Sequence, residues 1–340
     1  MKKLKLFDKL AFFLNSIVAF LLLLSYVIPY VAPKNFAFIS VLSLAVPILI
    51  IINILFFVFW LLKVKKHLLL SLVVLAIGFT YVGSLYKFSS SKDVKDSNNI
   101  SVMSYNVRLF NLYEWIEERD VPTKINSFIE EQDPDVISFQ EYKTNPKIFL
   151  NSYAYRFEHL EREAQIGQVI VSKYAIINSG SVEFPNTNNN AIYVDIVKNK
   201  DTIRVYNIHL QSLHISADMA KLKAGNSDIL MRKTRETFKI QQEQTELFLQ
   251  HKNQSKHKTI ITGDFNNTAY SYVYKQIKGD DLNDAFELAG NGFGRTFDFK
   301  FFPIRIDFIL SDNNFQVNGF KTYQEEFSDH YPIMAKLSLH

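Results

Sequence analysis

The chain has 340 residues, of which 48% are hydrophobic, and a formal net charge of +4 at pH 7. The charge is divided unevenly: residues 1–100 hold 11 Lys and Arg against 3 Asp and Glu, whereas residues 101–340 hold 27 against 31. The absence of cysteine excludes disulfides, zinc–thiolate sites and thiol nucleophiles, and the acidic second part disfavours broad electrostatic wrapping of nucleic acid.

Three apolar runs fill the first part of the chain, at about residues 10–31, 36–62 and 68–86. None of them contains a charged residue, and each approaches or exceeds the roughly 20 residues that a helix needs to cross a bilayer. A helix satisfies its own backbone hydrogen bonds, so such runs can cross lipid. We therefore predict that residues 1–86 form a membrane anchor of three transmembrane helices, against the alternative of buried helices in a soluble protein.

The lysines of the short loops predict the orientation of this anchor. The loop between the first two runs holds only Lys34, whereas the other two flanks are richer in lysine (Lys2, Lys3, Lys5 and Lys9 before the first run; Lys63, Lys65 and Lys66 after the second). Cytoplasmic loops carry the excess of positive charge, so three crossings leave the C-terminal part outside the cytoplasm. We expect that part to be periplasmic or extracellular. The polar pair Asn15–Ser16 inside the first run is interpreted as helix packing.

A second region follows a polar linker at residues 87–99. From residue 100 onward, short apolar strands alternate with occasional helices, the latter at about 121–131 and 232–251. Residues 211–231 lack periodicity and are predicted to be a long loop. Strands are predicted at 100–107, 135–140, 166–172, 191–197, 203–209, 258–263, 304–310, 315–323 and 331–337. Many strands with few helices predict two stacked sheets with helices outside, in one domain covering residues 100–340.

Polar side chains recur where these predicted strands begin or end. Each alone has an ordinary structural explanation, such as a turn or a solvated loop, but their order along successive strand boundaries indicates a shared site. Hard oxygen donors without thiols suit Mg²⁺, and a histidine near a carboxylate can activate water. The set comprises Asn106, Gln140-Glu141, His209, Gly263-Asp264-Phe265-Asn266, Asp307 and Ser328-Asp329-His330.

These segments resemble the endonuclease/exonuclease/phosphatase superfamily. The resemblance covers roughly residues 100–340 and none of the apolar region. It implies an α/β fold, a four-layer αββα sandwich of two mixed sheets, here preceded by the three transmembrane helices. The matching segments are Ser104-Tyr105-Asn106-Val107, Phe139-Gln140-Glu141, Asn207-Ile208-His209-Leu210, Gly263-Asp264-Phe265-Asn266, Arg305-Ile306-Asp307-Phe308-Ile309-Leu310 and Ser328-Asp329-His330-Tyr331-Pro332.

The resemblance also implies metal-binding roles. Glu141 would be the principal ligand of a Mg²⁺ ion, with Mn²⁺ as the alternative, helped by Asn106 and Asp329.

Catalytic roles follow from the same resemblance. His330 would be the general base or a phosphate-contacting imidazole, with Asp307 as its orienting carboxylate. Asp264 and Asn266 would orient water or bind the phosphate, and His209 would donate to a phosphate oxygen.

Together these features predict a membrane-anchored, metal-dependent phosphodiesterase or nuclease-like hydrolase. Its substrate would be nucleic acid, phospholipid or a small phosphodiester, with phosphomonoesters also open, because family members share the core and differ in their loops. The lipid bilayer and the phosphate ester are the expected partners, and no protein partner is predicted. The alternative is a non-catalytic, membrane-anchored binding protein on the same fold.

Overall fold

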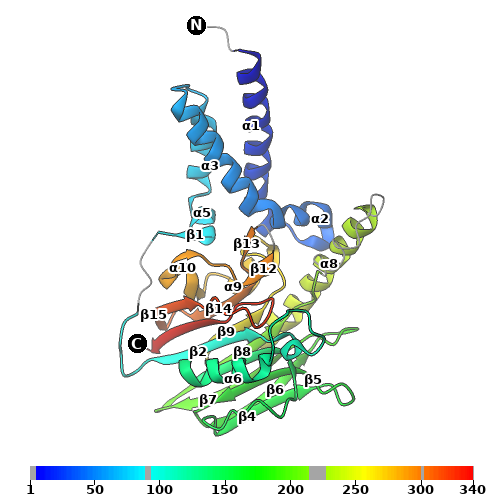
Figure 1. The fold of residues 1–340 in the computed structure, drawn as a ribbon, viewed down its shortest axis with the longest axis vertical. Helices are drawn as coiled ribbons and strands as arrows, with labels where there is room; N and C mark the ends of the chain where they lie inside the picture. Colours follow the sequence, from blue (N-terminus) through cyan, green and yellow to red (C-terminus); the bar gives the residue numbers. More distant parts are fainter. Residues whose placement is uncertain (1–4, 89–92, 214–226, 300–301, 340) are drawn as a thin grey trace.

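The computed structural model describes residues 5–88, 93–213, 227–299 and 302–339. A group of N-terminal helices projects from one side of a β-sandwich (Figure 1). In chain order these helices are α1 (Leu6–Ser25), η1 (Ile28–Tyr30), α2 (Pro33–Ser40), η2 (Val41–Ala45), α3 (Val46–Leu62), α4 (Leu68–Ile77) and α5 (Phe79–Leu85). The stretches Leu6–Tyr30 and Pro33–Leu62 are both long and apolar enough to cross a membrane.

The predicted single helix over 68–86 is interrupted, because α4 and α5 are bent by 78° relative to each other. The break lies at Gly78, where a Cβ would stand 2.0 Å from the hydroxyl of Tyr26. Glycine both weakens the helix and permits this close approach. The pair forms a third span only if the two bent halves cross together, so the continuous third helix of the sequence analysis is corrected to a broken one.

The second apolar run also changes direction. Phe36 has non-helical backbone angles inside α2, with φ −140° and ψ 59°. In Figure 1, α2 lies across the base of the helical group, beside the long helix α8 (Ser227–Lys252) of the sandwich. In the first run, Asn15 accepts a 2.8 Å hydrogen bond from Ser71 of α4, which agrees with its interpretation as a packing residue.

Two six-stranded mixed sheets form the sandwich. The first has the order β15-β16-β2-β3-β5-β4 and the second β10-β14-β9-β8-β7-β6. Only β2–β3 and β8–β9 are parallel among the pairs of these two sheets. The first sheet contains β2 (Ile100–Asn106), β3 (Val136–Lys143), β4 (Tyr155–Leu160), β5 (Ile166–Ser172), β15 (Phe315–Thr322) and β16 (Ile333–Leu339). The second contains β6 (Ile176–Glu183), β7 (Asn190–Lys198), β8 (Asp201–His209), β9 (Lys258–Asp264), β10 (Leu282–Asp284) and β14 (Asp307–Asp312).

Three hydrophobic cores hold four layers together. The central core joins the inner faces of both sheets, for example Val102 with Val205. In a second core, α6 (Val121–Gln132) packs against the first sheet. In a third core, α8 and α9 (Tyr272–Lys278) pack against the second sheet. This confirms the predicted αββα sandwich. Short elements complete it, namely η3 (Arg108–Asn111), α10 (Ala285–Ala289), β11 (Gly292–Phe293), β12 (Phe297–Phe299) and β13 (Phe302–Ile304).

Several predicted boundaries differ from the observed ones. The strand expected at 304–310 is divided, and β14 begins only at Asp307. Helix α8 begins at Ser227, so the last part of the predicted loop 211–231 is helical, while residues 214–226 lie outside the described residues. The predicted linker begins with strand β1 (Tyr86–Lys87), which pairs with β11, and Val94 further along donates a 2.9 Å hydrogen bond to Asn318.

Candidate active site

The sheet register brings the predicted residues to one edge of the sandwich. His209 ends β8 and lies opposite Asp264, which ends the parallel strand β9. Asp264 in turn lies opposite Asp307, the first residue of the antiparallel strand β14. Gly263 has φ +134°, and a Cβ there would stand 2.0 Å from the carbonyl of Ile208. Glycine before Asp264 therefore permits the close approach of β8 and β9 at this edge.

His330 and Asp307 form a buried hydrogen-bonded pair in the site. The Nδ1 atom of His330 lies 3.1 and 3.0 Å from the two carboxylate oxygens of Asp307, and both side chains are buried. The ring of Phe297 packs edge-on against the imidazole, with 4.9 Å between centroids. A carboxylate on Nδ1 fixes the orientation of the ring and directs Nε2 into the site.

Asp264 stands at the centre. Its Oδ2 atom lies 3.7 Å from Nε2 of His330 and 3.8 Å from Nε2 of His209. It accepts hydrogen bonds from the side-chain amide of Asn106 at 3.1 Å and from the backbone amide of Asn266 at 2.7 Å. The carboxylate groups of Asp264 and Asp307 and the ring of His330 present atoms within 4.8 Å of one another, a spacing that could hold a metal ion.

Glu141 approaches the same centre from the other sheet. It has a left-handed φ of 48° and lies where the β3–β5 register shifts, so the irregularity redirects its side chain. Its Oε1 atom accepts a 3.2 Å hydrogen bond from Asn106 and lies 3.8 Å from Nε2 of His209. Asn106 therefore bridges the carboxylates of Glu141 and Asp264, one from each sheet.

Two predicted residues have different partners. The side-chain amide of Asn266 donates to the carbonyl of Leu210 at 2.9 Å, so it ties the loop after β9 to the loop after β8. Asp329 pairs with Arg108 at 2.8 Å, and the guanidinium of Arg108 also covers the ring of Trp115 at 4.3 Å. Asp329 thus lies beside the site but already has a cationic partner.

The environment shifts the ionisation of His330 and Asp264 in an uncommon way. Burial, the largest effect, raises the pKa of Asp264 to about 8, and the negative charge of Asp307 adds to it against the opposing effect of His330. Burial alone would lower the pKa of His330, but Asp307 and Asp264 together raise it to about 10. At neutral pH the imidazole is therefore charged while Asp264 retains much of its proton.

Burial instead lowers the pKa of His209, against the opposing charge of Glu141. Its Nε2 atom is buried and has no hydrogen-bond partner among the residues that the structure describes. Buried polar atoms are nearly always satisfied, so an orphan at this position points toward a group that the site is built to receive.

Sequence analysis missed a buried polar layer directly below the site. Gln140 donates to Asn207 across the two sheets at 2.6 Å, and Thr262 donates to Ser138 at 2.7 Å. Thr296 was also missed; its hydroxyl accepts the backbone amides of Ile306 and Asp307 at 3.0 and 3.1 Å. Gln140 directly precedes Glu141, and Asn207 lies two residues before His209, both inside the family-like segments. Their place in these segments was the signal that could have identified them.

Comparison with known families agrees with this geometry. The Endonuclease/Exonuclease/phosphatase family model matches residues 103–330, which include every predicted site residue. The chain belongs to this family. A second model, a domain of unknown function (DUF8431), matches residues 8–85. No curated protein matches the chain.

Several solved structures share the fold. The endonuclease/exonuclease/phosphatase of Bacteroides vulgatus is 17% identical, with 71% of this chain and 99% of that chain covered and a TM-score of 0.55. The human Nocturnin catalytic domain with bound sulfate is 17% identical, covering 73% of this chain and 97% of that one, with a TM-score of 0.54. D. rerio TDP2 in complex with single-strand DNA product is 18% identical, covering 72% and 100%, with a TM-score of 0.53.

Proposed function

We propose that the chain is a membrane-anchored, metal-dependent phosphoesterase, with an anchor at residues 1–86, a linker at 87–99 and a catalytic domain at 100–340. The observation that carries this proposal is the buried cluster of Asp264, Asp307 and His330, with His209 at 3.8 Å from Asp264. Two carboxylates and two imidazoles around one small space suit the attack of water on phosphorus and the stabilisation of the resulting charge.

The directions of the pKa shifts suggest which of these residues accepts a proton and which donates a hydrogen bond. Asp264, with its pKa raised to about 8, is a carboxylate basic enough to accept a proton from water near neutral pH. His330, with its pKa raised to about 10, is charged and suits the phosphate-contacting role rather than that of the base. Neutral His209 supplies an N–H donor to a phosphate oxygen.

The residues present fit a divalent ion. Glu141 would hold it, and Asn106, whose side-chain amide donates to Glu141, would orient that carboxylate. The orphaned Nε2 of His209 and the excess of carboxylates over cations support a site made for a cation beside a phosphate. A bound Mg²⁺ would act as a Lewis acid on a phosphoryl oxygen. Asp329 would position Arg108 beside the site and would not bind the ion, since its carboxylate already pairs with that guanidinium.

The experiment is hydrolysis by the full chain in detergent, with and without Mg²⁺, across a simple phosphodiester, a phosphomonoester, DNA, RNA and phospholipids. We expect turnover that chelation removes and that Mg²⁺ or Mn²⁺ restores. Failure on every ester would refute the proposal and favour a non-catalytic binding role for the fold.

The location of the catalytic domain is part of the same proposal. The lysine distribution supports a periplasmic or extracellular position. Alkaline phosphatase fused after His340 is expected to be active. Activity of a cytoplasm-only reporter at the same position would contradict the orientation.

A further inference from the structure

The loop that follows Asp264, which we call the catalytic loop, runs directly to the N-terminal helices. Four residues after Asp264, the hydroxyl of Thr268 donates to the carbonyl of Ser43 in η2 at 3.2 Å. Tyr270 follows; its ring stacks on Tyr81 of α5 with 5.6 Å between centroids, and its hydroxyl donates to the carbonyl of Tyr81 at 3.1 Å. The catalytic loop is thus fixed to two separate elements of the helical region.

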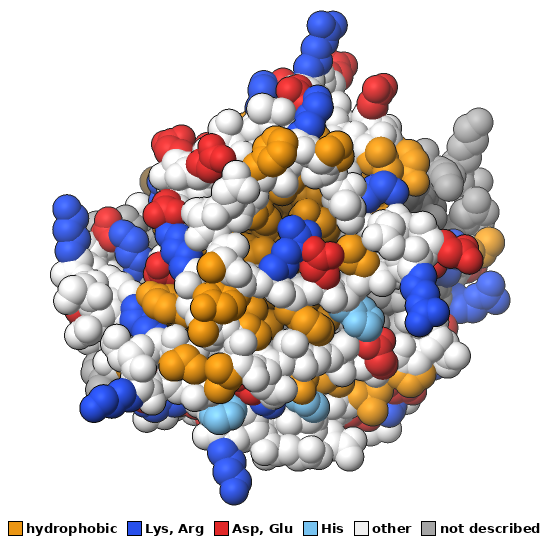
Figure 2. All heavy atoms as spheres, turned by 90° about the horizontal axis from the view of Figure 1, so that it is seen from below, with side chains coloured by type: hydrophobic (Ala, Val, Ile, Leu, Met, Phe, Trp, Pro, Cys, Tyr) orange, Lys and Arg blue, Asp and Glu red, His pale blue; other side chains and the backbone are white. Residues whose placement is uncertain are grey.

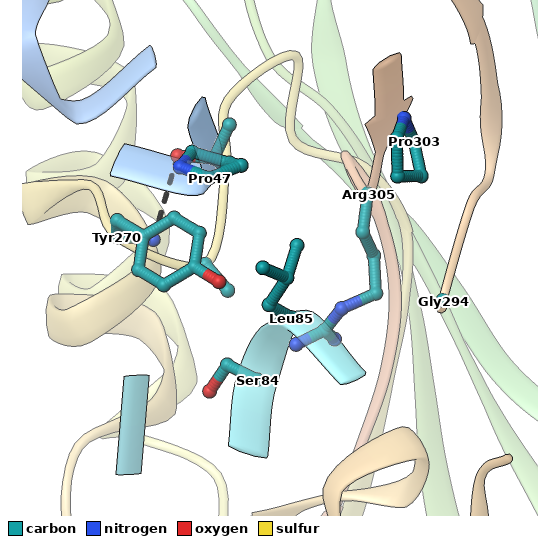
Figure 3. Close-up of a pocket in the computed structure, with 9 residues that line it drawn as sticks. Pro47, Ser84, Leu85, Tyr270, Gly294, Pro303 and Arg305 are labelled. Carbon is teal, nitrogen blue, oxygen red and sulfur yellow. Dashed lines mark hydrogen bonds between the residues drawn. The ribbon is translucent and has the colours of Figure 1, made fainter. Parts of the chain in front are cut away.

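A second connection starts at Asp307. Two residues earlier, Arg305 turns its guanidinium into a small cavity at the junction with the helices, and Figure 3 shows it directed toward Ser84 and Leu85 of α5. Pro47 of α3 completes that wall. Arg305 is buried and paired with Asp284 at 2.6 Å, so this part of the junction is a packed interior.

A third connection passes through α8. The side-chain amide of Gln241 donates to the backbone carbonyl of Asn266 at 3.3 Å, within the catalytic loop. One residue later, Gln242 accepts the backbone amide of Lys34 in α2, and Lys34 pairs with Glu246 at 2.8 Å. Three independent contacts therefore hold the site edge against the helices.

Chain geometry sets how far the site is from the bilayer. An extended chain advances at most about 3.6 Å per residue, so Asp264 lies within about 14 Å of Thr268 and its contact with η2. Ser43 lies just before α3, at the end of this candidate span that faces the sandwich (Figure 1). Tyrosines gather at the same level, with Tyr26 and Tyr81 4.7 Å apart beside Tyr270, as is typical of a membrane–water interface.

We propose that the substrate is a lipid whose phosphoester lies in the headgroup layer of the bilayer that holds the anchor. This inference rests on the proposed function and narrows its substrate class. Hydrolysis would form a bond from the water oxygen to phosphorus and break one P–O bond to the lipid. The water proton passes to Asp264, which later releases it to solvent, and the leaving oxygen takes up one proton from solvent, so that the enzyme returns to its starting state. A polyanion such as nucleic acid fits less well, because residues 101–340 hold 31 Asp and Glu against 27 Lys and Arg. The face turned away from the helices likewise intersperses acidic and basic side chains around hydrophobic ones (Figure 2).

The test uses the full chain in vesicles of phosphatidylethanolamine and phosphatidylglycerol with Mg²⁺. Labelled phospholipid is placed either in the same vesicles as the protein or in separate protein-free vesicles, and bis-(p-nitrophenyl) phosphate is the soluble reference. We expect hydrolysis of lipid in the same vesicles about 100-fold faster than in separate ones, because the anchor confines enzyme and substrate to one surface. Hydrolysis of the soluble ester without hydrolysis of lipid would overturn this inference alone, and hydrolysis of neither would overturn the proposed function with it.

A pair of variants at Tyr81 tests the junction itself. Tyr81→Ala removes the ring that stacks on Tyr270 and is expected to slow lipid hydrolysis about three- to tenfold, with the soluble ester cleaved as before. Tyr81→Phe keeps the stacked ring and serves as the matched control. Equal losses on lipid and soluble ester would contradict a positioning role. If Tyr81→Ala does not fold, the comparison of same and separate vesicles still decides the proposal.

Discussion

Two buried carboxylates of opposite character flank strand β8, one near each end: Asp195 of β7 and Asp264 of β9. Near the start of β8, Arg204 makes a double hydrogen bond to Asp195 at 2.6 and 2.7 Å, and this partnership outweighs burial so that the pKa of Asp195 is lowered. Beside the other end of β8, Asp264 lies 3.7 and 3.8 Å from the nearest imidazole nitrogens, and burial raises its pKa. A buried carboxylate therefore has a cationic side chain within hydrogen-bond distance at one end of β8. At the other end it does not, and we call that carboxylate under-partnered.

The contrast between Asp195 and Asp264 distinguishes a carboxylate that stabilises the fold from one that serves the proposed activity. A paired buried carboxylate stabilises its charged form, whereas an under-partnered one costs free energy and is retained for a reason other than folding. The far end of the sandwich should therefore govern unfolding and the near end turnover. Four predictions test this division.

The largest effect is expected at the site. Asp264→Asn and His330→Ala should each lower turnover by about 10³-fold or more, because in the proposed mechanism each removes a group that acts on the reacting atoms. Asp264→Asn should leave the melting temperature unchanged or raise it, since a costly buried carboxyl group is replaced by a neutral group of the same shape. Hydrolysis and thermal unfolding of the full chain in detergent measure both. A large loss of stability in Asp264→Asn would contradict the proposal that the site end governs turnover and the far end governs unfolding.

The far end should respond in the opposite way. Arg204→Met leaves Asp195 buried without its cation and is expected to cost about 3–5 kcal/mol in the free energy of unfolding. Turnover below the melting transition should stay near that of the unchanged chain, because β8 remains in place. The double variant Arg204→Met with Asp195→Leu should recover most of the stability. Equal instability of single and double variants would show that the ion pair is not the cause.

The sequence predicted the near end better than the far end. Residues such as His209 and Asp264 stand at the ends of apolar strands within recognisable segments, so their convergence followed from parallel pairing of β8 and β9. Asp195 and Arg204 belong to different strands, and their contact depends on the β7–β8 register, which single-strand patterns do not contain.

The same limit explains the other missed features. Strand β4 (Tyr155–Leu160) is an edge strand without a buried residue, so it lacks the apolar run that identified the central strands. The bend at Gly78 depends on the approach of Tyr26 from another helix. The partnership of Asp329 with Arg108 likewise depends on the loop after β2 folding back onto the C-terminal segment. Each feature is created by tertiary contact.

The pH dependence of hydrolysis should report the under-partnered end. A base must lose its proton, so activity should rise with pH up to about 8, the value to which the pKa of Asp264 is raised, and fall about tenfold per unit below it. Charged His330 must keep its proton, so activity should decline above about 10. A rate profile of the Mg²⁺-loaded chain measures both limbs. His257→Gln, which changes a histidine beside Asp195, should move neither limb; a profile that is flat between pH 6 and 8 would contradict the role of Asp264.

The smallest effect is expected at Asn207, two residues before the end of β8. Gln140→Leu removes the 2.6 Å hydrogen bond to Asn207 and leaves a buried acceptor unpaired, which should cost about 1–3 kcal/mol in the free energy of unfolding. Chemical denaturation measures this loss, and Gln316→Leu, an exposed glutamine on β15, is the control with little expected change. Because Gln140 directly precedes Glu141, turnover should also fall modestly. Lost turnover with unchanged stability would assign the polar layer to the site instead of to the scaffold beneath it.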